Sequence, residues 1–251
     1  MSLIRNKITR NIKSLALLGL NYLSPGGTAI LMYHSVGRNK IFFTVKPEDF
    51  QKQMACLSAK GYSVVPLARL AEMIKNKEEF PRKTVVLTFD DSFEDNYSNV
   101  FPVLKKYNFP ATFFVATDFI GKDQKNESTG IFFKTLSWPQ IKEMSESGLI
   151  DFEPHTSTHR ELTGISLEEA KKEILDSKRA IEEGLGKKCH FFAYPRGKYD
   201  EEIIKILKEN GFLAAVTVNP GRVRKTSDLL KLPRQSIDSL TYKLQFLHKI
   251  L

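Results

Sequence analysis

The sequence has little cysteine, few histidines and no long apolar run. Its 2 cysteines, Cys56 and Cys189, lie far apart in apolar contexts and match no metal-ligand spacing, so we expect two buried free thiols. They leave the redox compartment open. No internal repeat or low-complexity stretch interrupts the chain, and 251 residues with 41% hydrophobic content indicate one domain with a core of ordinary size.

The apolar run nearest the N-terminus, residues 15–20, is too short to cross a bilayer, which takes about 20 apolar residues. No small-residue cleavage site follows it. Three interpretations of residues 1–25 stay open: an interfacial helix that touches a membrane through residues 1–24, an ordinary helix that closes the bottom of a barrel, and an uncleaved signal. We treat 1–25 as a basic amphipathic segment and 26–251 as the main domain. The basic residues of the segment are Arg5, Lys7, Arg10 and Lys13.

The chain is basic, with 38 Lys and Arg against 29 Asp and Glu and a formal net charge of +9. This balance suits an anionic membrane surface or an acidic polymer. Nucleic acid is the rival partner. The basic residues are dispersed and show no recognition-helix, zinc-finger or RNA-binding signature, so we expect no nucleic-acid binding. We expect a cell-envelope or membrane-associated protein, and a cytoplasmic location stays open.

Strand-like and helix-like segments alternate after Gly27. Short apolar or β-branched runs predict strands at residues 29–33, 62–65, 84–89, 111–116, 149–152, 190–194 and 213–218. Helical patterns between them cover residues 47–60, 67–77, 167–185 and 200–210. The alternation predicts parallel β/α units, but periodicity alone does not separate an open doubly wound sheet from a barrel.

The most informative feature is a pair of carboxylates followed later in the chain by a pair of histidines. Thr88-Phe89-Asp90-Asp91 ends an apolar strand, and His155-Thr156-Ser157-Thr158-His159 holds two of the 5 histidines. Each half has an ordinary interpretation, a helix N-cap for the aspartates and exposed loop residues for the histidines. Together they predict a divalent-metal site with three protein ligands and an open position for water. Adjacent aspartates at a strand end point in opposite directions, so one can hold the metal while the other addresses the proton of the water.

These segments and Phe192-Ala193-Tyr194-Pro195-Arg196-Gly197 resemble the NodB-like polysaccharide deacetylases, over roughly residues 28–236. The resemblance implies an α/β fold, a distorted (β/α)7 TIM-like barrel in a single domain, with its chemistry at the C-terminal strand ends. It implies that Asp90 is the catalytic base and that Asp91, His155 and His159 bind a divalent metal ion, with zinc as the expected ion. It also implies that the turn of Tyr194, Pro195, Arg196 and Gly197 lines the substrate groove.

His34 ends the first predicted strand and is our candidate for the general acid. Many family members carry a leucine-x-histidine near the C-terminus whose histidine is the acid, and residues 229–237 contain none. In a closed barrel the first and last strands are neighbours, so a permuted member can present this histidine from its first strand. A polar residue that simply leaves a strand is the ordinary interpretation of His34, and His248, in an apparent terminal helix, is its competitor.

Three positions depart from the family pattern. Ser92 stands where glycine is usual, which is tolerable if the backbone there is not left-handed. Arg196 stands where tyrosine is usual; if the backbone N–H of this turn steadies the oxyanion, as in relatives, the change can alter substrate choice without abolishing activity. The arginine that often braces the catalytic aspartate is absent from its usual motif, near Phe192. Arg234 can replace it from another strand end, because a guanidinium fork orients a carboxylate through two bonds.

The resemblance therefore implies a metal-dependent hydrolase that removes N-acetyl groups from N-acetylglucosamine-type residues of a cell-envelope polysaccharide or oligosaccharide. Two alternatives stay open: deformylation or O-deacetylation of a lipid-linked sugar, and a catalytically inactive carbohydrate-binding barrel. The sequence does not choose among peptidoglycan, poly-N-acetylglucosamine, chitin fragments and lipid-linked precursors.

Overall fold

The computed structural model describes residues 27–125 and 130–251. The N-terminal segment 1–25, with its predicted membrane contact, therefore lies outside the described residues. Within those residues, none of the helices combines the length and the apolar content that crossing a bilayer requires. Both cysteines are free thiols, as predicted, with Cys189 buried and Cys56 half-buried.

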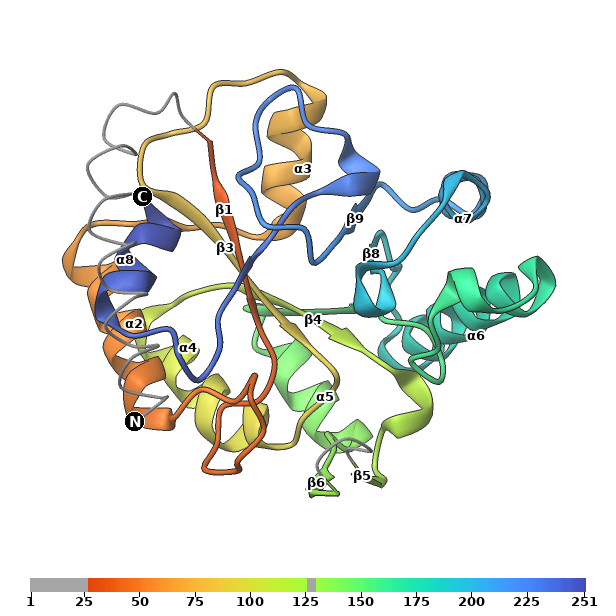
Figure 1. Cartoon of the computed structure of the whole chain (residues 1–251), viewed down its shortest axis with the longest axis horizontal. Helices are drawn as coiled ribbons and strands as arrows, with labels where there is room; N and C mark the ends of the chain where they lie inside the picture. Colours follow the sequence, from red (N-terminus) through yellow and green to blue (C-terminus); the bar gives the residue numbers. More distant parts are fainter. Residues whose placement is uncertain (1–26, 126–129) are drawn as a thin grey trace, which may run out of the picture.

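A parallel sheet forms the centre of the molecule (Figure 1). β1 (Ala29–Tyr33) pairs with β3 (Thr84–Asp90), and β4 (Ala111–Val115) joins β3 to β7 (Ile150–Pro154). On the other side of β1 lies β10 (Gln235–Ser236). All of these pairs are parallel, so the C-terminal ends of the strands meet at one edge, which we call the catalytic edge.

A second parallel pair, β8 (Phe191–Ala193) and β9 (Ala214–Val216), continues the wall beyond β7. Val216 of β9 bridges Leu232, just before β10, so the wall returns to β1. Among the described strands, no backbone ladder joins β7 to β8. At this β7–β8 seam the Glu153 carboxylate accepts the backbone N–H groups of His190 and Phe191, each at 3.0 Å. The chain thus has the predicted α/β architecture of a distorted barrel. Its ladder is missing at the β7–β8 seam and is reduced to a single bridge between β9 and Leu232.

Helices cover the outside of this wall (Figure 1). They are α2 (Pro47–Ala59), α3 (Leu67–Lys75), α4 (Phe101–Tyr107), α5 (Trp138–Glu146), α6 (Leu167–Leu185), α7 (Glu201–Glu209) and α8 (Lys243–Ile250). The short strand β2 (Ser63–Val64) pairs with the start of β3, and β5 (Asp123–Lys125) and β6 (Phe132–Lys134) form an antiparallel hairpin. Single helical turns cover Asn96–Val100, Thr117–Phe119, Leu162–Gly164, Pro195–Gly197 and Leu229–Lys231. The helices predicted from periodicity correspond to α2, α3, α6 and α7.

The alternation of side chains along β3 decides which of them reach the catalytic edge. Phe89 packs in the main core, where its ring stacks on that of Phe113 with centroids 4.6 Å apart. Thr88 and Asp90 point to the opposite face, because successive strand side chains alternate. There Arg234 Nη1 donates to Thr88 Oγ1 at 3.1 Å and to Asp90 Oδ1 at 2.8 Å. All residues of β3 are buried, as expected for a parallel strand covered on both faces.

Candidate functional site

The predicted metal ligands converge at the catalytic edge. Asp91 follows β3, and His155 and His159 follow β7. Asp91 Oδ1 lies 3.6 Å from His155 Nε2 and 3.3 Å from His159 Nε2. In a tetrahedral zinc site with bonds of 2.0–2.1 Å, neighbouring ligand atoms are ~3.4 Å apart. Asp91 Oδ1 is also buried without a hydrogen-bond partner, so these three residues fit a divalent ion that this oxygen would ligate.

The surroundings of His155 leave the lone pair of its Nε2 free to bind a metal. His155 Nδ1 lies 2.7 Å from the carbonyl oxygen of Ala193 on β8. A carbonyl can only accept, so Nδ1 carries the proton and Nε2 presents its lone pair to the ligand cluster. Burial lowers the pKa of His155 to about 4, and the neighbouring His159 acts in the same direction. At neutral pH the imidazole is therefore uncharged, as metal binding requires.

Asp90 is bound by Arg234, which is fully buried. The guanidinium makes two hydrogen bonds to the carboxylate, from Nη1 to Oδ1 at 2.8 Å and from Nη2 to Oδ2 at 2.7 Å. Burial alone would raise the pKa of Asp90, but the charge and hydrogen bonds of Arg234 outweigh it and hold this pKa at about 2. Asp90 is consequently ionised and fixed in orientation, as a base that accepts a proton from water must be.

His34 lies on the far side of Asp91, at the end of β1. Its Nε2 is 4.0 Å from Asp91 Oδ2, and its ring packs on Phe43 with centroids 4.8 Å apart. The competitor His248 sits beside Lys249, whose carbonyl accepts a hydrogen bond from Arg222 at 3.3 Å. Arg222 also binds the carbonyl of Gly27, just before β1, at 2.8 Å. His248 is thus near the start of β1, at the opposite end of the barrel, and only His34 adjoins the ligand cluster.

Comparison with known proteins places this site in a family. A family model described as polysaccharide deacetylase matches residues 77–215. The chain belongs to the polysaccharide deacetylase family. It is 33% identical, over 202 residues, to the poly-beta-1,6-N-acetyl-D-glucosamine N-deacetylase of Staphylococcus epidermidis, a match that covers 76% of this chain and 67% of that protein.

Solved structures of deacetylases share the fold of this family member. The Streptococcus pyogenes deacetylase PplD, solved in complex with acetate, superposes with a TM-score of 0.79 at 29% identity, covering 91% of this chain and 100% of that one. IcaB from Ammonifex degensii superposes with a TM-score of 0.80 at 26% identity, covering 91% of this chain and 99% of that one. The protein is therefore a hydrolase of the NodB-like deacetylase type with a distorted barrel fold.

Ser92, which replaces the glycine usual in the family, does lie in left-handed backbone. Its φ is 60°, and that of Asp91 is 73°. From the sequence, serine is expected to be tolerated here only if the backbone is not left-handed, and that expectation is not met. The serine hydroxyl instead accepts the backbone N–H of Ala116 at 3.1 Å, a hydrogen bond that glycine lacks. This bond offsets the strain of a side chain in the left-handed region.

The turn after β8 lies next to His155 through its backbone rather than its side chains. Tyr194 is fully buried and its hydroxyl donates to the carbonyl of Leu230 at 2.9 Å, so its ring belongs to the core. That the turn as a whole lines a substrate groove stays a prediction. Pro195 is buried as well, whereas the Arg196 side chain is exposed. Arg196 and Gly197 have φ of 54° and 69°, which turns the chain sharply beside the Ala193 carbonyl that orients His155.

Sequence reasoning missed two carboxylates near the site, the half-buried Asp95 and the buried Glu153. Asp95 lies four residues after Asp91, but its hydrogen bonds are to Ser35 and Val36, which follow His34 at another strand end. Glu153 lies just before His155 and binds the start of β8. The only available signal was a charged residue within or beside an apolar segment, a pattern that does not identify the partner.

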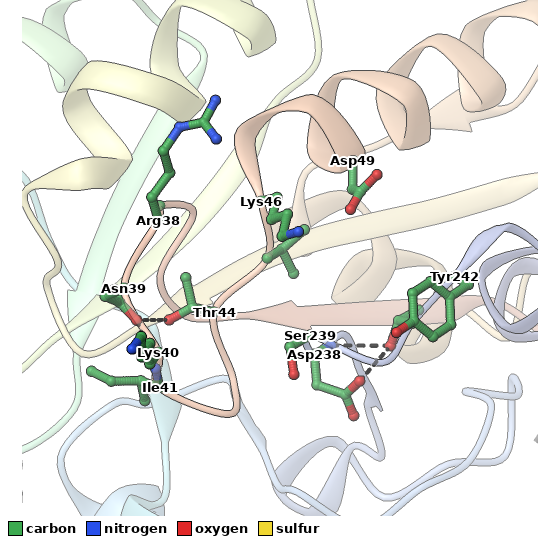
Figure 2. Close-up of a pocket in the computed structure, with 13 residues that line it drawn as sticks. Arg38, Asn39, Lys40, Ile41, Thr44, Lys46, Asp49, Asp238, Ser239 and Tyr242 are labelled. Atoms are coloured by element: carbon green, nitrogen blue, oxygen red, sulfur yellow. Dashed lines mark hydrogen bonds between the residues drawn. The ribbon is translucent and has the colours of Figure 1, made fainter. Parts of the chain in front are cut away.

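A cavity of about 290 Å³ lies between two loops at the catalytic edge (Figure 2). Its walls are residues 37–46 of the β1–α2 loop, the start of α2, and the loop between β10 and α8, including Asp238 and Tyr242. Asn39 stiffens the first wall, because its Oδ1 accepts the Thr44 hydroxyl at 2.5 Å and the Ile41 N–H at 3.0 Å. Both loops follow the C-terminal ends of neighbouring parallel strands, so the cavity lies at the same edge of the sheet as the candidate site.

Proposed function

We propose that this polysaccharide deacetylase removes N-acetyl groups from N-acetylglucosamine-type residues of a cell-envelope glycan, using one zinc ion held by Asp91, His155 and His159. The observation that carries the proposal is the contrast between two adjacent carboxylates. Both carboxylate oxygens of Asp90 accept hydrogen bonds from Arg234, whereas Asp91 presents an oxygen without a hydrogen-bond partner to two histidines. This separates a proton acceptor from a metal ligand within one short segment, and it argues against an inactive carbohydrate-binding barrel.

The side chains of the site divide the reaction between them. The ion, when bound, supplies a Lewis acid for the amide carbonyl and lowers the pKa of the attacking water. Asp90, oriented by Arg234, accepts the proton of that water. His34 donates a proton to the leaving amine, and the backbone at Arg196 stabilises the developing oxyanion. The products are acetate and a free glucosamine amine.

The named activity of the Staphylococcus epidermidis relative supports a β-linked N-acetylglucosamine polymer as the substrate. The charge of +9 and the basic segment 1–25 support a location at the cell envelope, with peripheral membrane contact through residues 1–24. Deformylation or O-deacetylation of a lipid-linked sugar is the second candidate, which the same basic segment favours.

Acetate release from defined substrates tests the proposal. Purified protein with added zinc is incubated with peptidoglycan, poly-N-acetylglucosamine, chitin fragments and a lipid-linked N-acetylated precursor, and both acetate and free amine are measured. We expect acetate and amine in equal amounts from at least one glycan, with loss of both after chelation and recovery on addition of zinc. Acetate without amine would identify an O-deacetylase, and activity that survives exhaustive chelation would refute the metal site.

A further inference from the structure

The imidazole of His34 lacks the hydrogen bond that usually orients a catalytic histidine. In the part of the chain that the structure describes, His34 Nδ1 is buried and has no hydrogen-bond partner. Its Nε2 is 4.0 Å from Asp91 Oδ2, which exceeds hydrogen-bond length. The ring is therefore oriented by its packing on Phe43 and by the position of its own backbone.

Hydrogen bonds to Asp95 hold the backbone that follows His34. Ser35 Oγ donates to Asp95 Oδ2 at 2.5 Å, and the Val36 N–H donates to Asp95 Oδ1 at 3.1 Å. Both oxygens of one carboxylate thus bind the two residues that follow His34. The approach is close, because a Cβ atom added at Gly37 would lie 2.7 Å from Asp95 Oδ2. Only glycine fits there without displacing the carboxylate.

The same network reaches the ring against which His34 packs. Asn39 Nδ2 donates to Ser35 Oγ at 2.9 Å, and Asn39 Oδ1 accepts the Thr44 hydroxyl at 2.5 Å (Figure 2). Phe43 lies beside Thr44 in this loop. Asp95 therefore holds both the backbone of His34 and, through Ser35 and Asn39, the loop that carries Phe43.

We propose that Asp95 is a positioning residue for proton donation by His34. The segment 90–95 then contains the base, a metal ligand and the anchor of the acid, so their relative positions are set within a few residues. The proposal rests on the proposed function for the role of His34, while the placement of the His34 ring by Asp95 is measurable without any substrate.

The first test follows the histidine rings directly. Protein labelled with ¹⁵N-histidine gives ring signals for only 5 histidines, and that of His34 is identified by its loss in His34→Ala. We expect Asp95→Ala to shift or broaden the His34 signal while those of His190 and His248 stay unchanged. Asp95→Asn, which keeps one acceptor oxygen, should give a smaller change, and it serves as the test variant if the alanine variant does not fold. An unmoved His34 signal in the folded variant would overturn the proposal, whatever the activity.

The second test separates a positioning role from a general loss of stability. We expect Asp95→Ala to lower kcat on an N-acetylated oligosaccharide by ~10–10²-fold and to change kcat on 4-nitrophenyl acetate little, because the nitrophenolate leaves without a proton. Asp95→Asn should restore part of the loss. In a His34→Ala background Asp95→Ala should cause no further loss on the amide. A further loss there, or equal losses on both substrates, would contradict the proposal.

Glu94→Gln is the matched control. Glu94 precedes Asp95 and accepts a hydrogen bond from Gln140 at 3.3 Å, away from the His34 loop. This variant should leave the His34 signal and the amide-to-ester ratio unchanged. If the wild-type protein shows no amidase activity on any glycan, the proposed function fails, while the ring signals still decide whether Asp95 places His34.

Discussion

Asp90 and Asp91 are adjacent in the sequence, yet their surroundings assign them to different chemistry. The carboxylate of Asp90 is neutralised by a buried guanidinium, and that of Asp91 faces two imidazoles. Strand alternation sends the two side chains in opposite directions, and the left-handed backbone at Asp91 turns the chain away immediately afterwards. One residue of register therefore separates the carboxylate that we propose as the proton acceptor from the one that we propose as a metal ligand.

We predict that Asp90→Asn binds zinc with unchanged stoichiometry and loses nearly all turnover. The amide cannot accept a proton from water, and the ligand cluster of Asp91, His155 and His159 is left intact. Metal content by elemental analysis and acetate release by an enzymatic assay measure the two properties. The variant also leaves the Arg234 charge buried without its partner, so a lower free energy of unfolding is expected, by about 3–5 kcal/mol. Retained turnover would remove Asp90 from the role of base.

Ser92 offers a prediction about backbone strain. Ser92→Ala keeps a Cβ atom in left-handed backbone and loses the hydrogen bond to Ala116, so we expect it to destabilise the protein by about 1–2 kcal/mol. Ser92→Gly loses the same bond but relieves roughly 1–2 kcal/mol of strain, and should remain within about 1 kcal/mol of the wild type. Urea unfolding of the three proteins measures the order. Equal stability of the alanine variant and the wild type would show that the hydroxyl bond contributes nothing.

At the scale of the elements, Glu153 makes the β7–β8 seam sensitive to pH. Burial raises the pKa of Glu153 to about 8, against the lowering effect of its backbone hydrogen bonds from Phe191 and His190. A carboxyl group with a raised pKa holds its proton more tightly in the folded chain than in the unfolded one. Its contribution to stability is therefore full below the unfolded pKa, which is about 4.3, and is lost as the pH rises towards 8.

The variant Glu153→Gln isolates this effect, because its amide oxygen can accept the same N–H groups and has no proton to lose. We expect the free energy of unfolding of Glu153→Gln, relative to that of the wild type, to increase between about pH 5 and about pH 8, by a few kcal/mol at most. Metal-free protein is used for both chains, so the histidine ligands contribute equally. A difference that stays constant with pH would mean that Glu153 is ionised in the folded protein.

The elements also show how far a sequence can be interpreted without coordinates. α6 coincides with its predicted range because both of its ends are marked locally, by the capping box of Ser166 and Glu169 and by Gly186 in left-handed backbone. α4, α5 and the β5–β6 hairpin were not predicted, although α5 begins with a capping box of Ser137 and Gln140 and β6 contains Phe132 and Phe133, so local signals for two of the three were present and were missed.

The candidate site, like the fold, could be predicted from the sequence only in part. Ligand types and strand ends predicted Asp91, His155, His159 and His34 as neighbours, and the chemistry of the guanidinium suggested Arg234 beside Asp90. The bond from Ser35 to Asp95 joins residues 60 positions apart, and those from Phe191 and His190 to Glu153 join two different strands. Such pairs carry no local pattern, because the fold alone brings them together.

At the scale of the whole molecule, the basic segment 1–25 remains a prediction about location. Each basic residue near an anionic surface can add about 1 kcal/mol of attraction, and the segment has Arg5, Lys7, Arg10 and Lys13. We expect deletion of residues 1–24 to abolish co-sedimentation with anionic liposomes and to spare hydrolysis of 4-nitrophenyl acetate. Liposomes of zwitterionic lipid are the control and should not bind the full chain. Unfolding on deletion would instead support a helix that closes the barrel.

The Asp90–Arg234 pair joins residues 144 positions apart, and His34 directly follows β1, which pairs with the strand that follows Arg234. The catalytic apparatus thus has no local precursor: during synthesis on the ribosome, the base emerges long before the guanidinium that orients it. Closing so large a loop is a late and entropically costly event in folding. A nascent chain with its first strands formed would hold the metal ligands and lack a working base. Hydrolysis should therefore begin only when the first and last strands of the barrel have come together. Acetate release would then report this late step of folding.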